Sequence, residues 1–293
     1  MKVAARRERL RSVLNGDETV LLPAVFDAVS ARIVEMAGFE IALLSGSVSA
    51  ASLQGVPDLI LVTMTEVVQL ARRIVGSTSL SIHVDGDHGF GNALNAMRCV
   101  REFEAAGVAS VTLEDMDLPR PYGSQGPSAI PIKEMCGKLK AAVSAREDPG
   151  LVIIGRTDTI RYRGVEEALE RARAYQETGV DAIFVAGART REELEAIREA
   201  VSLPLIGSGL PKAEDGKSGL QILQEIGYRM TLMAAFPFQV AIQAMHEAVT
   251  YLKEHGEPGR YAERMCSSEM LDAIIRTEQY ADYQERFMRD QGA

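Results

Sequence analysis

Eight short apolar runs recur through the chain, and each is followed by a turn signal and then by an amphipathic segment with helical spacing. The apolar runs occupy residues 20–24, 41–45, 80–85, 109–114, 151–157, 181–186, 203–208 and 229–233. The helical segments occupy residues 27–37, 65–75, 92–106, 132–145, 164–178, 190–200, 216–226 and 237–251. This alternation predicts parallel strands joined by helices, and eight such units favour a closed (β/α)8 TIM-type barrel of the α/β class. An open doubly wound sheet is the alternative, but no Gly-x-Gly-x-x-Gly sequence opens the first helical segment.

The length and composition suit one barrel domain over residues 1–293. A chain of 293 residues with 46% hydrophobic residues can bury one large core. The net charge is −9 and the basic residues are scattered, so we expect no nucleic-acid partner. Residues 1–10 are basic but no apolar segment follows them, as it would in a signal peptide. No apolar run is long enough to span a bilayer, so we expect a cytoplasmic protein with no membrane association. Cys99, Cys136 and Cys266 are widely spaced and suit reduced, structural thiols.

Polar or small residues stand where several of the apolar runs end. They are Ser45, Gly46 and Ser47 after the second run, Asp85 and Asp87 after the third, Glu114 after the fourth, Arg156 after the fifth and Ser208 after the seventh. In a barrel the strand ends converge on one face, where the active site is built. Asp115 and Asp158 also lie at strand ends, but each alone is more typical of a helix cap or a loop carboxylate. The pattern therefore predicts one constellation of side chains at the carboxyl ends of the strands.

Asp85 and Asp87 are the centre of this constellation. Alternate residues of a strand face the same side, so the two carboxylates would point together at the end of their strand. Like charges held that close raise one another's pKa unless a cation lies between them. Oxygen ligands of this kind favour Mg²⁺, with Mn²⁺ as a second candidate, over Zn²⁺. The spacing alone leaves open the alternative that both carboxylates only solvate a strand end.

These residues together suit a small substrate with two anionic groups. A metal held by Asp85, with Asp87 and Glu114 behind it directly or through water, would chelate an oxyacid. Residues 45–47 offer N–H groups and hydroxyls to a carboxylate, and Arg156 offers a planar fork to a second anion. Such a metal stabilises the enolate that forms when a C–C or P–C bond beside a 2-oxo group breaks. We expect a small-molecule 2-oxo acid as the substrate.

Two stretches depart from the repeating pattern. Residues 117–127 hold three prolines and two glycines, and a loop of this length in a compact domain predicts a gating loop over the active site. Residues 252–293 form a C-terminal helical tail, within which residues 267–288 have a further helical pattern. The apolar anchors of that pattern are Leu271, Ile274, Ile275 and Phe287. A helix beyond a complete barrel must pack on something, and another subunit is a reasonable candidate.

The order of these motifs resembles that of the isocitrate lyase and phosphoenolpyruvate mutase superfamily over nearly the whole chain. The sequence DGDHGFGN at residues 85–92 is similar to the DxDxGFGN or DxDxGYGN motif of that superfamily. The companion motifs also match in order: PAVFDAVSA at 23–31, SGS at 45–47, PD at 57–58, ED at 114–115 and IGRTD at 154–158.

The resemblance implies a Mg²⁺-dependent barrel in which Asp85 ligates the metal, while Asp87 and Glu114 act largely through water. The substrate-holding residues that it implies are Ser45, Gly46, Ser47 and Arg156. It also implies that Asp58 and Arg156 are catalytic residues. Similar members of the superfamily are homotetramers, built as dimers of dimers, that swap the last barrel helix between neighbouring subunits, so we expect the same assembly here.

The gating loop separates the activities within this superfamily. Isocitrate and methylisocitrate lyases carry KKCGH there, whereas this chain has RPYGS at residues 120–124 and also lacks the Lys-x-Asn-Ser stretch of phosphoenolpyruvate mutases. Residues 48–64 and 92–100 look most like the oxaloacetate decarboxylase branch, and residues 136–148 look like the carboxyvinyl-carboxyphosphonate phosphorylmutase branch. Residues 232–237 lack the histidine that the decarboxylase branch carries near the eighth strand, so substrate contacts on that side stay open.

We therefore expect a Mg²⁺-dependent carbon–carbon lyase that acts on a small 2-oxo or 2-hydroxy dicarboxylate, with decarboxylation of oxaloacetate to pyruvate and CO₂ as the best hypothesis. In the isocitrate and methylisocitrate lyases, the cysteine of the KKCGH loop gives a proton to the cleaved product. CO₂ departs without such a proton, which fits a loop that lacks cysteine. Phosphorus transfer or P–C bond chemistry is a second hypothesis, for which Ser124 is the plausible nucleophile in the loop. A methylisocitrate or dimethylmalate-type lyase is a third hypothesis, and an inactive barrel that binds a 2-oxo acid is a fourth.

Overall fold

The computed structural model describes residues 2–289 and contains eight parallel strands in one sheet. The strands are β1 (Val20–Pro23), β2 (Ile41–Leu44), β3 (Ser81–Asp85), β4 (Ser110–Glu114), β5 (Val152–Thr157), β6 (Ala182–Val185), β7 (Leu205–Gly207) and β8 (Tyr228–Met233). Their order is β1-β8-β7-β6-β5-β4-β3-β2. A parallel bridge between Ala24 and Leu43, with a 2.8 Å hydrogen bond from Val25 N–H to Leu43 O, joins β1 to β2. The predicted (β/α)8 barrel is confirmed.

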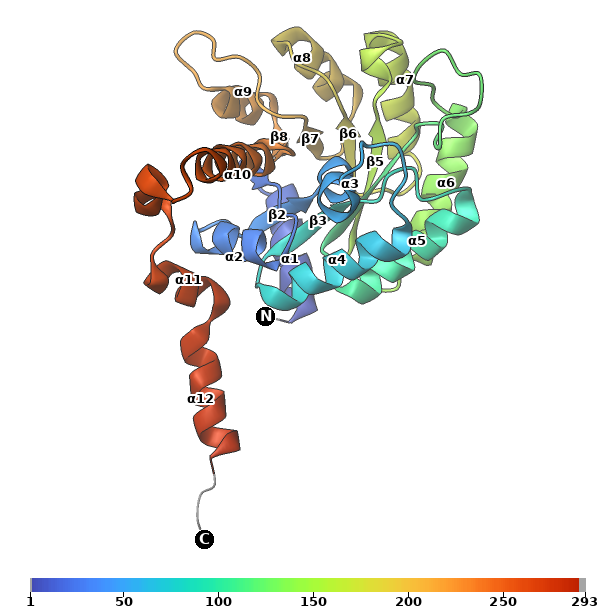
Figure 1. Ribbon diagram of the computed structural model, residues 1–293. Coiled ribbons are helices and arrows are strands. Elements are labelled where there is room, and N and C mark those ends of the chain that lie inside the picture. The colour runs from blue at the N-terminus through green and yellow to red at the C-terminus, as the bar shows by residue number, and fades with distance from the viewer. Residues whose placement is uncertain (1, 290–293) are drawn as a thin grey trace. The chain divides into compact units, whose positions relative to one another are not determined.

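Helices alternate with the strands along the chain (Figure 1). They are α1 (Val3–Asn15), α2 (Ala28–Met36), α3 (Gly46–Gln54), α4 (Met64–Ser77), α5 (Ala93–Ala106), α6 (Ile132–Ala145), α7 (Val165–Gln176), α8 (Arg191–Ala200), α9 (Gly219–Ile226), α10 (Phe236–His255), α11 (Ser268–Ile275) and α12 (Thr277–Met288), with short 3₁₀ helices η1 (Thr159–Arg161) and η2 (Gly259–Arg264). The eight expected helical segments correspond to α2 and to α4 through α10. Helices α1 and α3 were not expected from the sequence.

Side chains alternate along the strands between the barrel interior and the surrounding helices. On β3, Ile82 and Val84 belong to the apolar cluster beneath the helices, so His83 and Asp85 face the interior. The same alternation on β4 turns Glu114 inward. The barrel interior therefore presents ionisable side chains at the carboxyl ends of these two strands.

Helix α1 closes the amino-terminal end of the barrel. Leu10 and Leu14 are buried in the apolar cluster that fills the barrel interior. The Arg7 side chain is buried, donates to Val108 O at 3.1 Å and pairs with Asp148 at 2.5 Å. Because these partners lie just before β4 and β5, α1 covers the end of the barrel opposite to the carboxyl ends of the strands.

The described chain falls into two compact units, one ending at Pro237 and the other beginning at Phe238. In the second unit, Arg276 takes a left-handed conformation with φ of +60° and separates α11 from α12. The pattern over residues 267–288 is therefore two helices rather than one. Of the four expected anchors, Ile274 is buried, whereas Leu271, Ile275 and Phe287 are exposed.

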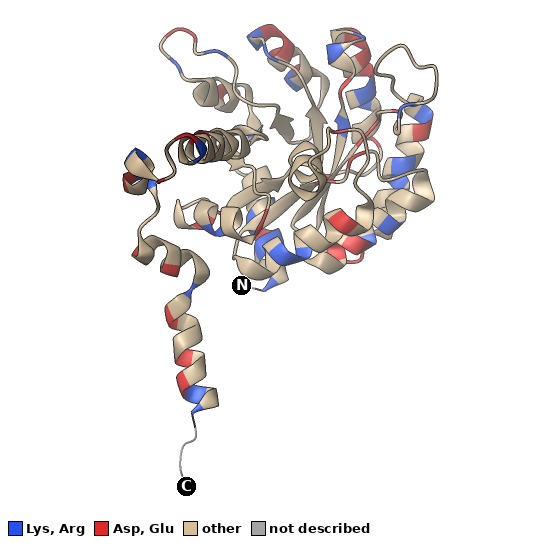
Figure 2. Cartoon of the chain, viewed as in Figure 1, with Lys and Arg blue, Asp and Glu red and all other residues tan. Residues whose placement is uncertain are grey.

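Charged residues of both signs are interspersed along the outer helices of the barrel, for example on α7 and α8 (Figure 2). Such mixed surfaces carry no single-sign stripe along those helices. Within residues 2–289, no helix combines the length and the apolar character needed to cross a bilayer.

Candidate active site

Two hollows open at the carboxyl ends of the strands, and the same four residues line both of them: Asp58, Asp85, Arg156 and Arg161. The first, here called the strand-end hollow, has a volume of about 200 Å³ and is lined further by Leu43, Ser45, Ser47, His83, Thr112, Phe184, Ala186, Ser208, Leu232 and Ala234. The second, here called the loop hollow, has a volume of about 480 Å³ and is lined further by Leu59, Asp87, Glu114, Met116, Leu118, Pro119, Arg120, Pro127, Asp158 and Tyr162. The structure thus brings the residues predicted at the strand ends into one region.

A tight turn after β3 places the predicted metal carboxylates together. Asp87 has a left-handed φ of +48°, and its N–H donates to Asp85 Oδ1 at 3.1 Å. The turn is tied to β4 by hydrogen bonds from Gly86 N–H to Thr112 O and from Glu114 N–H to Asp87 O, each 2.9 Å. These bonds bring Asp85, Asp87 and Glu114 to the same end of two neighbouring strands.

A buried lysine on α6 supports the same turn. Lys138 is 3% exposed, and its Nζ donates to the backbone O of His88 at 2.9 Å. His88 itself is buried and lines neither hollow, so its side chain faces away from the site. The role of Lys138 was not apparent from the sequence, because nothing local distinguishes it from the exposed Lys140 on the same helix.

Arg156 is the cation at the centre of the site. Its Nη1 lies 3.0 Å from Asp85 Oδ2, and its Nη2 lies 3.1 Å from Glu114 Oε2 and 2.8 Å from Asp158 Oδ2. Burial by itself would lower the pKa of Arg156. The charges of Glu114 and the other nearby carboxylates outweigh burial and raise this pKa well above its usual value, so the guanidinium remains charged. Asp158 occupies the N-cap position of η1, as expected, but its side chain makes no capping hydrogen bond there and pairs with Arg156.

The site holds more negative charge than Arg156 neutralises. Burial raises the pKa of Asp87, and the charges of Asp85 and Asp58 raise it further. Burial also raises the pKa of Glu114, against the lowering effect of Arg156. Such shifts mark carboxylates that lack a sufficient counter-charge.

The oxygen donors and surplus charge fit a hard divalent cation. A Cβ at Gly46 would lie 2.5 Å from Asp87 Oδ1 and 3.5 Å from Asp85 Oδ2, so only glycine leaves room beside these carboxylates. No group of three or more His, Cys, Asp or Glu residues in the described range has the arrangement of a direct metal site. A cation with one direct carboxylate ligand, Asp85, and with Asp87 and Glu114 acting through water, is compatible with the space beside Gly46 and with the lack of three direct ligands among the described residues.

Residues 45–47 begin helix α3 beside the strand-end hollow. Ser45 is the N-cap, and its Oγ lies 3.1 Å from Ser47 Oγ. Within residues 2–289, no side chain caps this helix, so its first N–H groups are available to an anion. Asp58 lines both hollows, and partial burial of its carboxyl group, followed by the charge of Asp85, raises its pKa.

His83 adds a neutral hydrogen-bonding group to the strand-end hollow. It is 1% exposed, its Nδ1 lies 2.8 Å from Ser110 Oγ, and its Nε2 lies 3.2 Å from Thr112 Oγ1. Burial lowers the pKa of His83 to about 4, so the imidazole is neutral at pH 7. By contrast, Asp115 lies outside both hollows and pairs with the buried Arg171 at 3.1 Å.

The predicted gating loop forms one wall of the loop hollow. It leaves and rejoins the barrel at a bridge between Met116 and Ala129. Its lining residues are Leu118, Pro119, Arg120 and Pro127. Ser124 lines neither hollow, and its hydroxyl donates to Gly126 O at 2.8 Å. The side chain named as the nucleophile of the phosphorus-transfer hypothesis is therefore directed within the loop itself.

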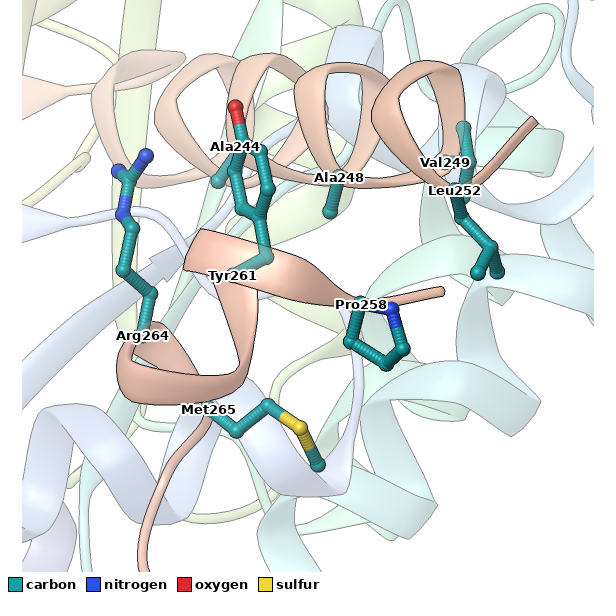
Figure 3. A pocket seen from close by; sticks show the side chains of 8 residues that line it. All are labelled: Ala244, Ala248, Val249, Leu252, Pro258, Tyr261, Arg264 and Met265. Carbon is teal, nitrogen blue, oxygen red and sulfur yellow. The ribbon is translucent and has the colours of Figure 1, made fainter. Parts of the chain in front are cut away.

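A further hollow of about 300 Å³ lies within the second unit, between α10 and η2 (Figure 3). Its walls are mostly apolar, with Ala248 and Leu252 from α10 facing Pro258. The charged side chain here, Arg264, lies 3.5 Å from Glu247 Oε2. An apolar hollow of this kind is poorly suited to an oxyacid, so the strand-end and loop hollows form the candidate active site.

A TIM-type barrel that gathers carboxylates, an arginine and helix N–H groups at its strand ends defines an enzyme for small anionic substrates. Residues 10–253 match the phosphoenolpyruvate phosphomutase family. The chain belongs to this family, and the resemblance noted from its motifs is confirmed.

Among its relatives, the oxaloacetate decarboxylase of Rhodopseudomonas palustris strain BisB18 is 41% identical over 272 residues, which cover 93% of each chain. A solved structure of phosphoenolpyruvate phosphomutase from Streptomyces platensis subsp. rosaceus is 27% identical, with a TM-score of 0.87 and coverage of 98% and 99% of the two chains. The structure of phosphonopyruvate hydrolase in complex with oxalate and Mg²⁺ is 25% identical, with a TM-score of 0.88 and coverage of 97% and 99%.

Proposed function

We propose that the protein decarboxylates oxaloacetate to pyruvate and CO₂. The observation that carries the proposal is the gating loop, whose lining residues Leu118, Pro119, Arg120 and Pro127 include no proton donor that works at neutral pH. Cleavage of a larger leaving group would need such a donor, whereas CO₂ leaves without one. The identity of about 40% to oxaloacetate decarboxylases over most of the chain supports the same reaction.

The reaction breaks the bond between C3 and C4 of oxaloacetate, and the electron pair moves toward the C2 oxygen to give an enolate. The first N–H groups of α3 and the hydroxyls of Ser45 and Ser47 would bind the C1 carboxylate. Arg156 holds Asp85 and Glu114 in place and offsets part of their charge. The gating loop excludes water from the enolate while the bond between C3 and C4 breaks. C3 then takes up a proton from solvent when the loop opens.

The cofactor we propose is Mg²⁺, with Mn²⁺ as a substitute, held directly by Asp85 and through water by Asp87 and Glu114. When bound, the cation supplies positive charge beside the developing enolate oxygen. The support is the surplus of negative charge around Arg156 and the space that Gly46 leaves beside Asp87.

The test is a substrate panel of oxaloacetate, methylisocitrate, dimethylmalate and phosphonopyruvate, assayed with Mg²⁺ for pyruvate and CO₂ against a blank without enzyme. We expect turnover of oxaloacetate well above the other three. Preferred turnover of phosphonopyruvate would move the P–C bond hypothesis ahead. Binding of oxalate without any turnover would favour an inactive binding barrel.

Replacing Asp85 by Ala should abolish both turnover and binding of Mn²⁺, measured by electron paramagnetic resonance, because the direct ligand is lost. The control is Asp17→Ala, since the Asp17 side chain is fully exposed. An Asp85→Ala enzyme with near-normal activity at saturating Mg²⁺ would contradict the assignment of Asp85.

We also propose that the protein is a homotetramer. Helix α10 is 20 residues long and has no buried residue, although Ile242, Met245 and Val249 are apolar and share one face of the helix. Covering such a face by another copy of the chain would remove this apolar surface from water. Sedimentation velocity should then give a mass of about four chains, and a monomer would contradict the proposal.

A further inference from the structure

The donor groups of Arg156 are already occupied by the protein's own carboxylates. Its Nε donates to Asp158 Oδ2 at 2.9 Å, and its two terminal nitrogens reach Asp85, Glu114 and Asp158 at 2.8–3.1 Å. A substrate carboxylate that competed for Arg156 would have to displace one of these partners. We expected the guanidinium of Arg156 to bind the second anionic group of the substrate. Because its nitrogens are already paired, another cation is better suited to that role.

Arg161, at the end of η1, is such a cation. It lines both hollows, and its side chain is 51% exposed. Its ion-pair partner within residues 2–289 is Asp158, at 3.6 Å from Nη1 to Oδ1, and this Oδ1 has no hydrogen-bond partner. The guanidinium of Arg161 thus faces the hollows with no hydrogen bond to another described residue.

The backbone after β6 is shaped to receive the Arg161 side chain. Gly187 has a left-handed φ of +106°, and a Cβ at this position would lie 2.6 Å from both Cγ and Nε of Arg161. Any other residue at 187 would push Arg161 out of its present position. The position of Arg161 over the hollows is therefore built into the fold, although the side chain is half exposed.

The rest of this wall offers no competing charge. Phe184, Leu232 and Ala234 are apolar, and Ser208 is neutral. Arg120 lines only the loop hollow. Among the described residues that line the strand-end hollow, Arg161 is the cation whose charge is not already shared among several carboxylates.

We propose that Arg161 binds the second carboxylate of the substrate and so selects a 2-oxo dicarboxylate over a shorter acid such as oxalate. This inference rests on the proposed function, in which the 2-oxo acid end binds at the carboxylates and at helix α3. In oxaloacetate the second carboxylate is C4, which leaves as CO₂.

A cation at the leaving carboxylate affects binding more than the chemical step. The C4 carboxylate carries a full charge in the bound substrate and loses it as the C3–C4 bond breaks and the electron pair moves toward the C2 oxygen. An ion pair at C4 is therefore stronger in the ground state than in the transition state, so its loss should raise KM without lowering kcat to the same extent.

The test compares Arg161→Gln with Arg163→Gln, a control at an exposed arginine that lines neither hollow. For Arg161→Gln, the KM for oxaloacetate should rise about tenfold or more, as expected for loss of a charge-assisted hydrogen bond, while kcat changes less than about threefold. The inhibition constant of oxalate should stay within about twofold of the wild-type value, because oxalate lacks the distal carboxylate. Arg161→Lys should restore part of the KM, since it keeps the charge.

A binding readout separates this inference from the proposed function. Malate keeps both carboxylates but has no 2-oxo group to accept the electron pair, so its binding can be measured by calorimetry without turnover. Arg161→Gln should weaken binding of malate and not of oxalate, even if oxaloacetate proves not to be the substrate. Equal weakening of both ligands, no change in either, or no binding of malate to the wild-type enzyme would each overturn the role of Arg161.

Discussion

Gly46 offers a test of the active site that should leave the fold intact. In Gly46→Ala, the new Cβ would lie 2.5 Å from Asp87 Oδ1, well inside an ordinary contact. The carboxylate must withdraw by roughly 1 Å to restore normal packing. A misplacement of that size in a preorganised site costs about 100-fold in rate, or about 2.7 kcal/mol of transition-state stabilisation.

The thermal stability of the Gly46→Ala variant should be unchanged or higher, although its activity falls. Gly46 is the first residue of α3, and alanine is favoured over glycine in helices by up to about 1 kcal/mol. Since the atom that must move is the end of a side chain rather than backbone, we expect a melting temperature equal to or above that of the wild type.

The measurements are kcat/KM for oxaloacetate, the affinity for Mn²⁺ by electron paramagnetic resonance, and the melting temperature. Gly137→Ala on α6 is the matched control, because no atom lies within 4 Å of a Cβ there. We expect both kcat/KM and Mn²⁺ affinity to fall only in Gly46→Ala. If that variant kept kcat/KM and metal affinity within threefold of the wild type, the placement of a cation beside Asp87 would be refuted.

Three further substitutions separate stability, metal binding and loop function. Arg171→Met leaves the carboxylate of Asp115 buried without its charged partner, with only the hydroxyl of Tyr175 still donating to it, so the free energy of unfolding in urea should fall by about 3–5 kcal/mol; a loss below about 1 kcal/mol would contradict this. Lys138→Met removes the ammonium that supports the turn after β3, so Mn²⁺ affinity should fall about tenfold, whereas Lys140→Met should match the wild type; equal effects would argue against a positioning role. Ser124→Ala should keep kcat/KM within about threefold, because its hydroxyl bonds only within the loop, and a dead variant that still binds oxalate would favour phosphorus transfer.

The fold was largely predictable because its signals are local. Each strand is an apolar run and each outer helix a 3.6-residue pattern, so eight repeats specify the barrel without knowledge of distant contacts. Helix α3 was not expected because SGS at residues 45–47 resembles a loop, yet these residues form a helix start. Helix α1 was not expected because its buried Arg7 resembles a surface residue until its partners on other loops are known.

The candidate site was predictable where its residues lie at or next to the carboxyl end of a strand, as Asp85, Glu114 and Arg156 do. The position of Asp158 beside Arg156 could have been inferred from the side-chain alternation of β5, but an aspartate before a helix has a simpler explanation as a cap. The part played by Arg161 depends on Gly187, 26 positions away in sequence, and on the way Arg156 is already paired. Such roles depend on tertiary contacts that no local pattern reports.

The junction between β1 and β2 has a consequence for the dynamics of the barrel. Strand β4 pairs with β5 along its full length, from Ser110 with Val152 to Glu114 with Arg156. Strands β1 and β2 instead meet at the isolated bridge of Ala24 with Leu43. Local unfolding costs least where backbone hydrogen bonds are fewest, so amide hydrogen exchange should be fastest at this junction. The helix start at Ser45 follows β2, so the amides proposed to bind the substrate can fluctuate while the carboxylate cluster on β3 to β5 stays rigid.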